Sequence, residues 1–129
     1  MKLKHQSNID LIPDCPLVNE DGEMELFRCV ENPISEQSFI PQAVLLKPKY
    51  QNLCQAWGLS TSKSHKHASQ LLKNLSKNKR VQYAQVAKMQ VTNDHGIKYS
   101  GKNREHYTFF PNEEIRLVES FTILESNGN

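Results

Sequence analysis

The chain has no long hydrophobic run. None of its apolar segments approaches the ~20 residues that a membrane-spanning helix needs. The residues after Met1 are Lys-Leu-Lys-His-Gln, which differ from the apolar centre of a secretory signal. We therefore expect a cytoplasmic protein with no membrane partner. Apolar residues make up 37% of the 129 residues, at the low end for a compact domain, and this predicts a modest core with polar loops.

Cysteine is also scarce. An odd count of three (Cys15, Cys29 and Cys54) without a Cys-x-x-Cys pair argues against a disulfide framework and against a cysteine-based zinc site. Cys29 and Cys54 lie among apolar residues, so we expect buried thiols, with a catalytic Cys–His pair as the alternative. His65 and His67 are two apart on a predicted helix and point away from each other, so we expect no metal site.

Acidic residues are scarce in the middle third of the chain, and basic residues are scarce near its end. Residues 63–104 hold ten Lys and Arg against one acid, whereas residues 1–62 hold five against eight and residues 105–129 hold one against five. A basic middle third suits an anionic partner such as a nucleotide or a nucleic acid. The alternative is a solvated surface that the acidic flanks neutralise.

Hydrophobic periodicity predicts an α+β fold, with a mostly antiparallel sheet and one principal helix. We expect an N-terminal arm over 1–22 that packs across the domain, a single domain over 23–125 and a tail over 126–129. The pattern predicts, in order, a strand over 23–30, a short strand or buried turn over 42–47, a helical turn within 50–57, a short strand over 58–62, a helix over 63–77, a strand over 80–91, a basic loop over 97–104, a strand over 105–111 and one or two strands over 115–124.

The principal helix has an apolar face, because Ala68, Leu71, Leu72 and Leu75 recur at helical spacing. Just before it comes a group of hydroxyl residues, and Ser62 or Ser64 is suited to cap its first turn. Hydroxyl groups at a helix start, with lysines nearby, also suit a phosphate or another anion. Capping alone is the simpler alternative.

The first strand carries an arginine among apolar residues. Alternation places Leu26 and Arg28 on one face and Phe27 and Cys29 on the other, which is typical of a central strand with two covered faces. A buried arginine needs a partner. We consider a bound ligand, or an ion pair with an acid such as Glu119.

A second group of candidates combines basic and aromatic residues. Cations meet phosphates and flat rings stack on bases, so such a mixture suits a nucleic acid. His106 and Tyr107 also qualify as acid–base groups. The alternative is a loop above buried aromatics. The candidate nucleic-acid-binding residues are Lys63, Lys66, Lys98, Lys102 and Arg104.

The first-strand Arg28, the Ser60-Thr61-Ser62 segment before a helix and the late acids Glu113 and Glu114 together resemble the ADP-ribosyltransferase-like fold. The resemblance implies that the arginine holds phosphate or ribose, that the serine segment shapes a nicotinamide pocket and that a glutamate supports the reacting ribose. NAD is the cofactor it implies. The candidate catalytic residues are then Arg28, Ser60, Glu113, Glu114 and His106, and the candidate cofactor-binding residues are Arg28, Ser60, Thr61, Ser62 and Tyr107.

Two functions therefore stay open. One is a small ADP-ribosyltransferase-like protein, active as an enzyme or catalytically degenerate, that binds NAD or a phosphorylated RNA end. The other is a non-enzymatic module whose basic middle third binds nucleic acid or a protein partner.

Overall fold

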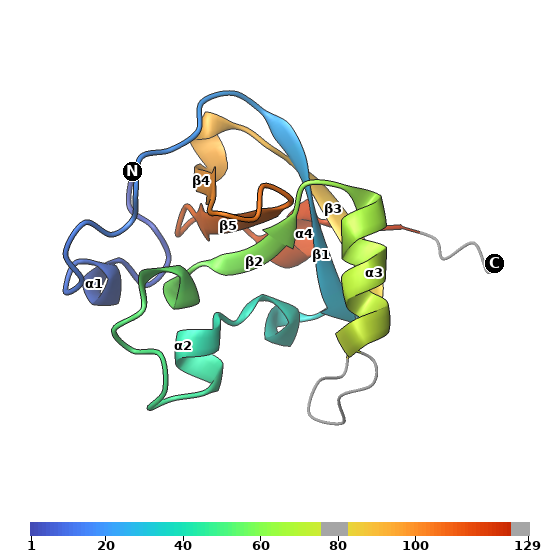
Figure 1. Ribbon diagram of the computed structural model, residues 1–129, viewed down its shortest axis with the longest axis horizontal. Helices are drawn as coiled ribbons and strands as arrows, with labels where there is room; N and C mark the ends of the chain where they lie inside the picture. The colour runs from blue at the N-terminus through green and yellow to red at the C-terminus, as the bar shows by residue number, and fades with distance from the viewer. Residues whose placement is uncertain (76–82, 125–129) are drawn as a thin grey trace.

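The protein is an α+β domain built on one six-stranded antiparallel sheet, as the periodicity predicted (Figure 1). The computed structural model describes residues 1–75 and 83–124. Its strands follow the spatial order β4-β5-β2-β1-β3-β6. Their bounds are Met24–Glu31 (β1), Leu59–Ser62 (β2), Tyr83–Val91 (β3), Gly96–Ser100 (β4), His106–Pro111 (β5) and Thr122–Ile123 (β6).

The longest described helix is α3, and the other helices in the described residues are single turns. The α-helices are α1 (Gln6–Ile9), α2 (Gln42–Leu45), α3 (His65–Leu75) and α4 (Leu117–Ser120), and the 3-10 helices are η1 (Glu36–Phe39), η2 (Cys54–Trp57) and η3 (Asn93–His95). In Figure 1, α3 lies across β1 and β3. The predicted end of this helix (76–77), the predicted start of the following strand (80–82) and the predicted tail (126–129) lie outside the described residues.

Both faces of β1 are covered, as expected of a central strand. Leu26 and Val30 point into the main apolar core, whereas Phe27 points to the other face and packs with Ala68 of α3 and Val86 of β3. The main core is formed by Leu26, Val30, Phe39, Leu59, Ala87, Met89, Val91, Tyr107, Phe109, Leu117 and Phe121.

The two strands beside β1 differ in how much of their length pairs with it. Strand β3 pairs with it along its whole length, from Met24 opposite Val91 to Glu31 opposite Tyr83. Strand β2 pairs with it at one position, Phe27 opposite Ser62. Beyond that pair the ladder of backbone hydrogen bonds between β1 and β2 stops.

The N-terminal segment is anchored to the far half of the sheet. Glu20 accepts hydrogen bonds from the backbone N–H (2.8 Å) and hydroxyl (3.0 Å) of Ser100 and from the hydroxyl of Tyr107 (2.7 Å). The Ser100 N–H, followed by the two hydroxyl donors, lowers the pKa of this carboxyl group. Lys98 donates from its ammonium to the carbonyls of Glu20 (2.8 Å) and Gly22 (2.6 Å).

The cysteine prediction is wrong for Cys54. It forms a disulfide with Cys15, 39 residues away, because the N-terminal segment returns to η2. Cys29 is the buried free thiol that we expected, and burial raises its pKa to about 11. Its sulfur donates to the carbonyl of Ala68 at 3.5 Å.

Residues 42–45 form a helical turn with Ala43 buried, which agrees with the turn alternative. Two further segments differ from expectation: residues 96–100 form a strand where a basic loop was expected, and residues 117–120 form a helix before β6. The strand was missed because its central residue, Lys98, is a buried lysine in an alternating pattern. No helix among the described residues is long and apolar enough to cross a bilayer.

Candidate active site on strands β2 and β5

Two serines of β2 share one face of the sheet. Leu59 and Thr61 point into the main core, so Ser60 and Ser62 point to the face that α3 covers. Strand β5 pairs beside them, with His106 opposite Ser62. Residues opposite each other in an antiparallel pair project to the same face. Two hydroxyl groups and an imidazole therefore meet on this face.

Each of these serines is hydrogen-bonded to a histidine. The Oγ atom of Ser60 lies 2.7 Å from Nε2 of His106, and the Oγ atom of Ser62 lies 2.8 Å from Nδ1 of His67 in α3. A hydrogen bond at one ring nitrogen fixes the orientation of the ring and leaves the other nitrogen for a different partner. The two imidazoles are therefore positioned by a single strand.

Burial and a neighbouring charge set the protonation of His106. Half-burial of the ring, followed by the positive charge of His67, lowers the pKa of His106 below its usual value near 6.5. The His106 ring is therefore neutral at pH 7 and is able to accept a proton.

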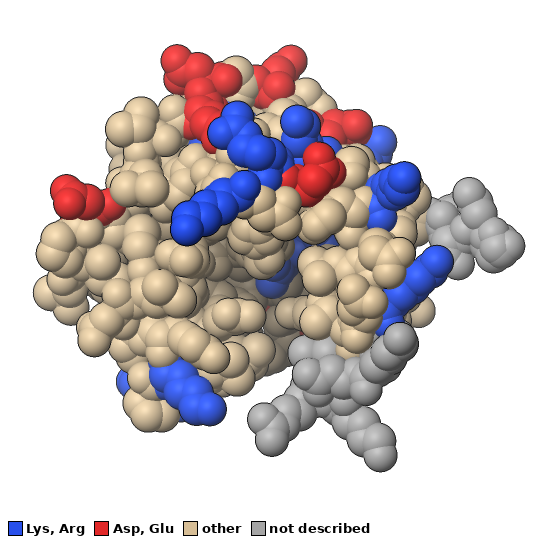
Figure 2. Space-filling model, viewed as in Figure 1, with Lys and Arg blue, Asp and Glu red and all other residues tan. Residues whose placement is uncertain are grey.

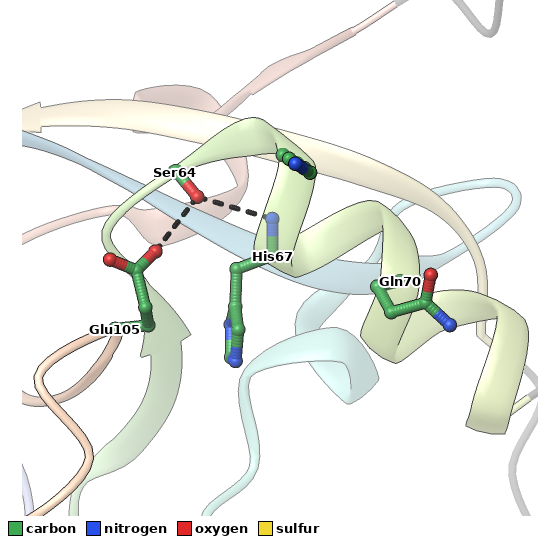
Figure 3. A pocket seen from close by; sticks show the side chains of 5 residues that line it. Ser64, His67, Gln70 and Glu105 are labelled. Carbon is green, nitrogen blue, oxygen red and sulfur yellow. Dashed lines mark hydrogen bonds between the residues drawn. The ribbon is translucent and has the colours of Figure 1, made fainter.

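The first turn of α3 continues the site (Figure 3). Ser64 caps this turn by accepting from the backbone N–H of His67 at 3.1 Å, and it donates to Oε1 of Glu105 at 3.0 Å. The capping prediction is thus confirmed for Ser64. An open pocket of about 290 Å³ lies here, lined by Ser64, Lys66, His67, Gln70 and Glu105.

Arg28 lies behind Ser60, in the gap between β1 and β2. Its Nε donates to the carbonyl of Ser38 at 3.0 Å and its Nη1 to the carbonyl of Ser60 at 2.7 Å. The guanidinium also lies 5.9 Å from the centre of the Phe39 ring. These contacts replace backbone pairing where the two strands separate. The predicted proximity of Arg28 to the serine strand is confirmed, although the contact is with a carbonyl.

The charge of Arg28 is buried without a counter-charge among the described residues. The side chain is 6% exposed, and no described carboxylate forms an ion pair with it. The expected alternative partner, Glu119, lies 3.7 Å from Arg116 instead. Burial lowers the pKa of Arg28, although a guanidinium stays protonated in a protein.

The predicted late acids lie away from this site. Glu113 and Glu114 follow β5, where Glu113 donates its N–H to the carbonyl of Lys2 and its carbonyl accepts from the ammonium of Lys4. Ser60 is opposite Thr108, and the three steps from Thr108 to Pro111 span roughly 10 Å at about 3.3 Å per strand residue before Glu113 and Glu114 are reached. The expectation that Glu113 or Glu114 joins Arg28 and Ser60 is therefore wrong.

The carboxylate that lies in the site is that of Glu105, which contacts Ser64 and lines the pocket and which the sequence did not predict. It immediately precedes β5, and its carbonyl accepts from the N–H of Lys63 at 2.8 Å. Its position next to the candidate His106, at the start of an aromatic strand, is the sequence feature that could have identified Glu105 as a site residue. The predicted acids, Glu113 and Glu114, lie beyond the other end of that strand.

Two predicted cofactor-binding residues have internal partners. Thr61 is 2% exposed and its hydroxyl donates to the carbonyl of Tyr107 at 2.8 Å. The hydroxyl of Tyr107 donates to Glu20, and burial together with this carboxylate raises the pKa of Tyr107. Both side chains hold the strands together and do not face the α3 side of the sheet.

The predicted nucleic-acid-binding residues divide in two. Lys98 is 1% exposed and its ammonium is enclosed by backbone carbonyls, which contradicts a role in binding phosphate. The others, Lys63, Lys66, Lys102 and Arg104, are exposed. Figure 2 shows basic side chains above a hollow on the face that it presents, with acidic side chains among and above them. The positive charge is therefore interrupted on this face.

Comparison of the chain with protein-family models, with curated proteins and with solved structures found no match.

Proposed function

We propose that the protein binds a nucleotide, either NAD or a phosphorylated RNA end, as an ADP-ribosyltransferase-like protein. The observation that carries this proposal is the guanidinium of Arg28, which is buried beside Ser60 without a described carboxylate partner. A buried charge without a counter-charge is costly, and an anionic ligand would offset that cost.

A phosphate fits the contacts that Arg28 leaves open. Its Nε and Nη1 atoms bond to two carbonyls, and no described residue accepts from Nη2. A guanidinium presents parallel N–H groups that match phosphate oxygens. Strand β1 pairs with β2 at a single position, so few backbone hydrogen bonds compete for the space around this group.

The remaining parts of the site suit a ribose. The hydroxyl of Ser60 and the ring of His106 offer donors and acceptors for sugar hydroxyl groups. Glu105, in place of Glu113 or Glu114, is the carboxylate suited to stabilise the positive centre that forms as nicotinamide leaves. Whether this carboxylate supports transfer or only binding decides between an active enzyme and a degenerate one.

A titration with NAD, ADP-ribose and a short RNA carrying a terminal phosphate tests the proposal. A ligand at a hundredfold excess over its Kd stabilises the folded state by about 2.7 kcal/mol, so the melting temperature should rise by several degrees. Arg28→Lys keeps the charge but loses the planar fork, and it should weaken binding at least about tenfold in calorimetry below its own melting temperature. The matched control Arg116→Lys, on an exposed side chain, should bind as the wild type does.

A non-enzymatic nucleic-acid-binding module is the second candidate, favoured by the exposed Lys63, Lys66, Lys102 and Arg104. Under this alternative, the double variant Lys102→Ala/Arg104→Ala should weaken RNA binding and reduce its salt dependence, whereas Arg28→Lys should leave binding unchanged. Absence of any NAD shift together with this pattern would replace the first proposal by the second.

A further inference from the structure

His67 and His106 form a pair whose geometry has a consequence beyond ligand binding. Their serine partners, Ser60 and Ser62, are two residues apart on one face of one strand, which separates them by roughly 7 Å. The two rings come from different elements, α3 and β5, and neither is bonded to a carboxylate among the described residues. Each keeps one ring nitrogen without a described partner.

We propose that His106 and His67 are the general base and general acid of a metal-independent RNA-cleaving site. The substrate class is a ribose 2′-hydroxyl group next to a phosphodiester. The 2′-hydroxyl supplies the proton that a base removes, and the phosphodiester supplies the 5′-oxygen that leaves and that an acid protonates. Two imidazoles held by serines roughly 7 Å apart on one face of a strand can serve both ends of such a reaction.

The reaction balances without a further reactant. His106 accepts the proton of the 2′-hydroxyl as its oxygen bonds to phosphorus. The bond from phosphorus to the 5′-oxygen breaks, and His67 donates a proton to that oxygen. The products are a 2′,3′-cyclic phosphate and a 5′-hydroxyl. The two histidines end with their protonation states exchanged, and solvent restores them.

The surroundings favour this assignment of the two roles. Half-burial and the charge of His67 lower the pKa of His106, which suits the base. The ring of His67 projects from the first turn of α3 between Glu105 and Gln70 and lines the open pocket (Figure 3), which suits a group that meets the leaving oxygen.

A phosphate next to these rings would meet positive charge. Lys66 lines the same pocket, and Lys63 is exposed one residue before Ser64. The nearby carboxylate of Glu105 accepts from Ser64, which holds it at the edge of the pocket. The proposal uses neither Arg28 nor NAD, so it stands or fails separately from the proposed function.

The test is incubation of the full chain with a 5′-labelled RNA oligonucleotide in excess EDTA. We expect fragments ending in a 2′,3′-cyclic phosphate. The same oligonucleotide with 2′-deoxyribose throughout should stay intact. His67→Gln and His106→Gln should each slow cleavage about a hundredfold or more, since general acid–base catalysis contributes at least that much.

His65→Gln is the matched control. His65 is on the same helix but stacks on Phe27, 5.9 Å between ring centres, and contacts neither serine. This variant should cleave within about twofold of wild type, and circular dichroism of all three variants should show a folded protein. The proposal is overturned if the wild type leaves the RNA intact, if it cleaves the deoxy strand, or if the folded His67→Gln and His106→Gln variants cleave at the wild-type rate. Retained NAD binding with intact RNA would reject this inference alone.

Discussion

The two halves of the sheet are held together by different means. In the half formed by β1, β3 and α3, a continuous antiparallel ladder and apolar packing supply the contacts. In the half formed by β2, β5 and β4, the ladders are joined by cross-links to the N-terminal segment, namely the Cys15–Cys54 disulfide, the Glu20 carboxylate and the backbone carbonyls that accept from Lys98 of β4. One backbone pair and Arg28 join the halves. The comparison teaches that the candidate site lies where regular pairing stops.

The largest expected effect is in the first half. Leu26→Ala removes a fully buried side chain from β1, opposite Met89, and should lower the free energy of unfolding by about 4 kcal/mol. Urea denaturation measures this. If the ladder dominates stability as we infer, the loss should exceed that of any single cross-link in the second half. Leu53→Ala, at a side chain 42% exposed, should cost less than about 1 kcal/mol.

The next effect concerns the disulfide. Cys15→Ser opens a covalent loop of 39 residues and should cost about 3 kcal/mol. Hydrogen exchange should increase at the amides of β4 and β5 more than at those of β1 and β3. Reductant should reproduce the loss in the wild type but change nothing further in the variant. Equal exchange in both halves would contradict the division that we describe.

A smaller effect is expected at Glu20. Glu20→Gln keeps the size of the side chain but removes its charge, so the bonds from Ser100 and Tyr107 lose their charge assistance, at about 1 to 2 kcal/mol. Because the folded state lowers the pKa of this carboxyl group, its contribution is present above its usual value of 4.5 and disappears as the pH falls through the folded value. The difference in stability between wild type and variant should therefore vanish in strong acid.

The smallest effect is the response of His106 to mild acid. Its folded pKa lies below its unfolded value near 6.5, so the unfolded chain binds the proton more readily and stability falls as the pH drops below that value. His106→Gln should have a flatter melting temperature between pH 7.5 and 5. Half-buried His5, whose pKa burial also lowers, should keep part of the slope in this variant. If the melting temperature of His106→Gln depends on pH as strongly as that of the wild type, the folded state does not lower the pKa of His106.

Local patterns predicted the elements whose contacts are close in sequence or strictly periodic. The apolar face of α3, with Ala68 buried, and the two faces of β1 follow from spacing alone. The side-by-side placement of Arg28 and the serine strand was also expected. These features depend on periodicity and on one motif, both of which a single sequence contains.

The rest depends on contacts between distant segments. Glu20 and Ser100 are 80 residues apart, and no local pattern announces their pairing. The partner of Cys54 was equally hidden, because the course of the N-terminal segment decides it. Glu105 was passed over for Glu113 because the direction of β5 relative to β2, which determines the end that meets Ser62, is a property of the sheet topology.

If Arg28 binds a nucleotide as we propose, its burial sets thermal stability against ligand recognition. Replacing a buried, unneutralised cation by an apolar side chain of similar volume is often neutral or stabilising once the neighbours repack. Selection of random variants at position 28 for heat resistance should therefore enrich residues such as Met or Leu, together with changes near Ser38. Those heat-resistant survivors should be the proteins that no longer retain a nucleotide.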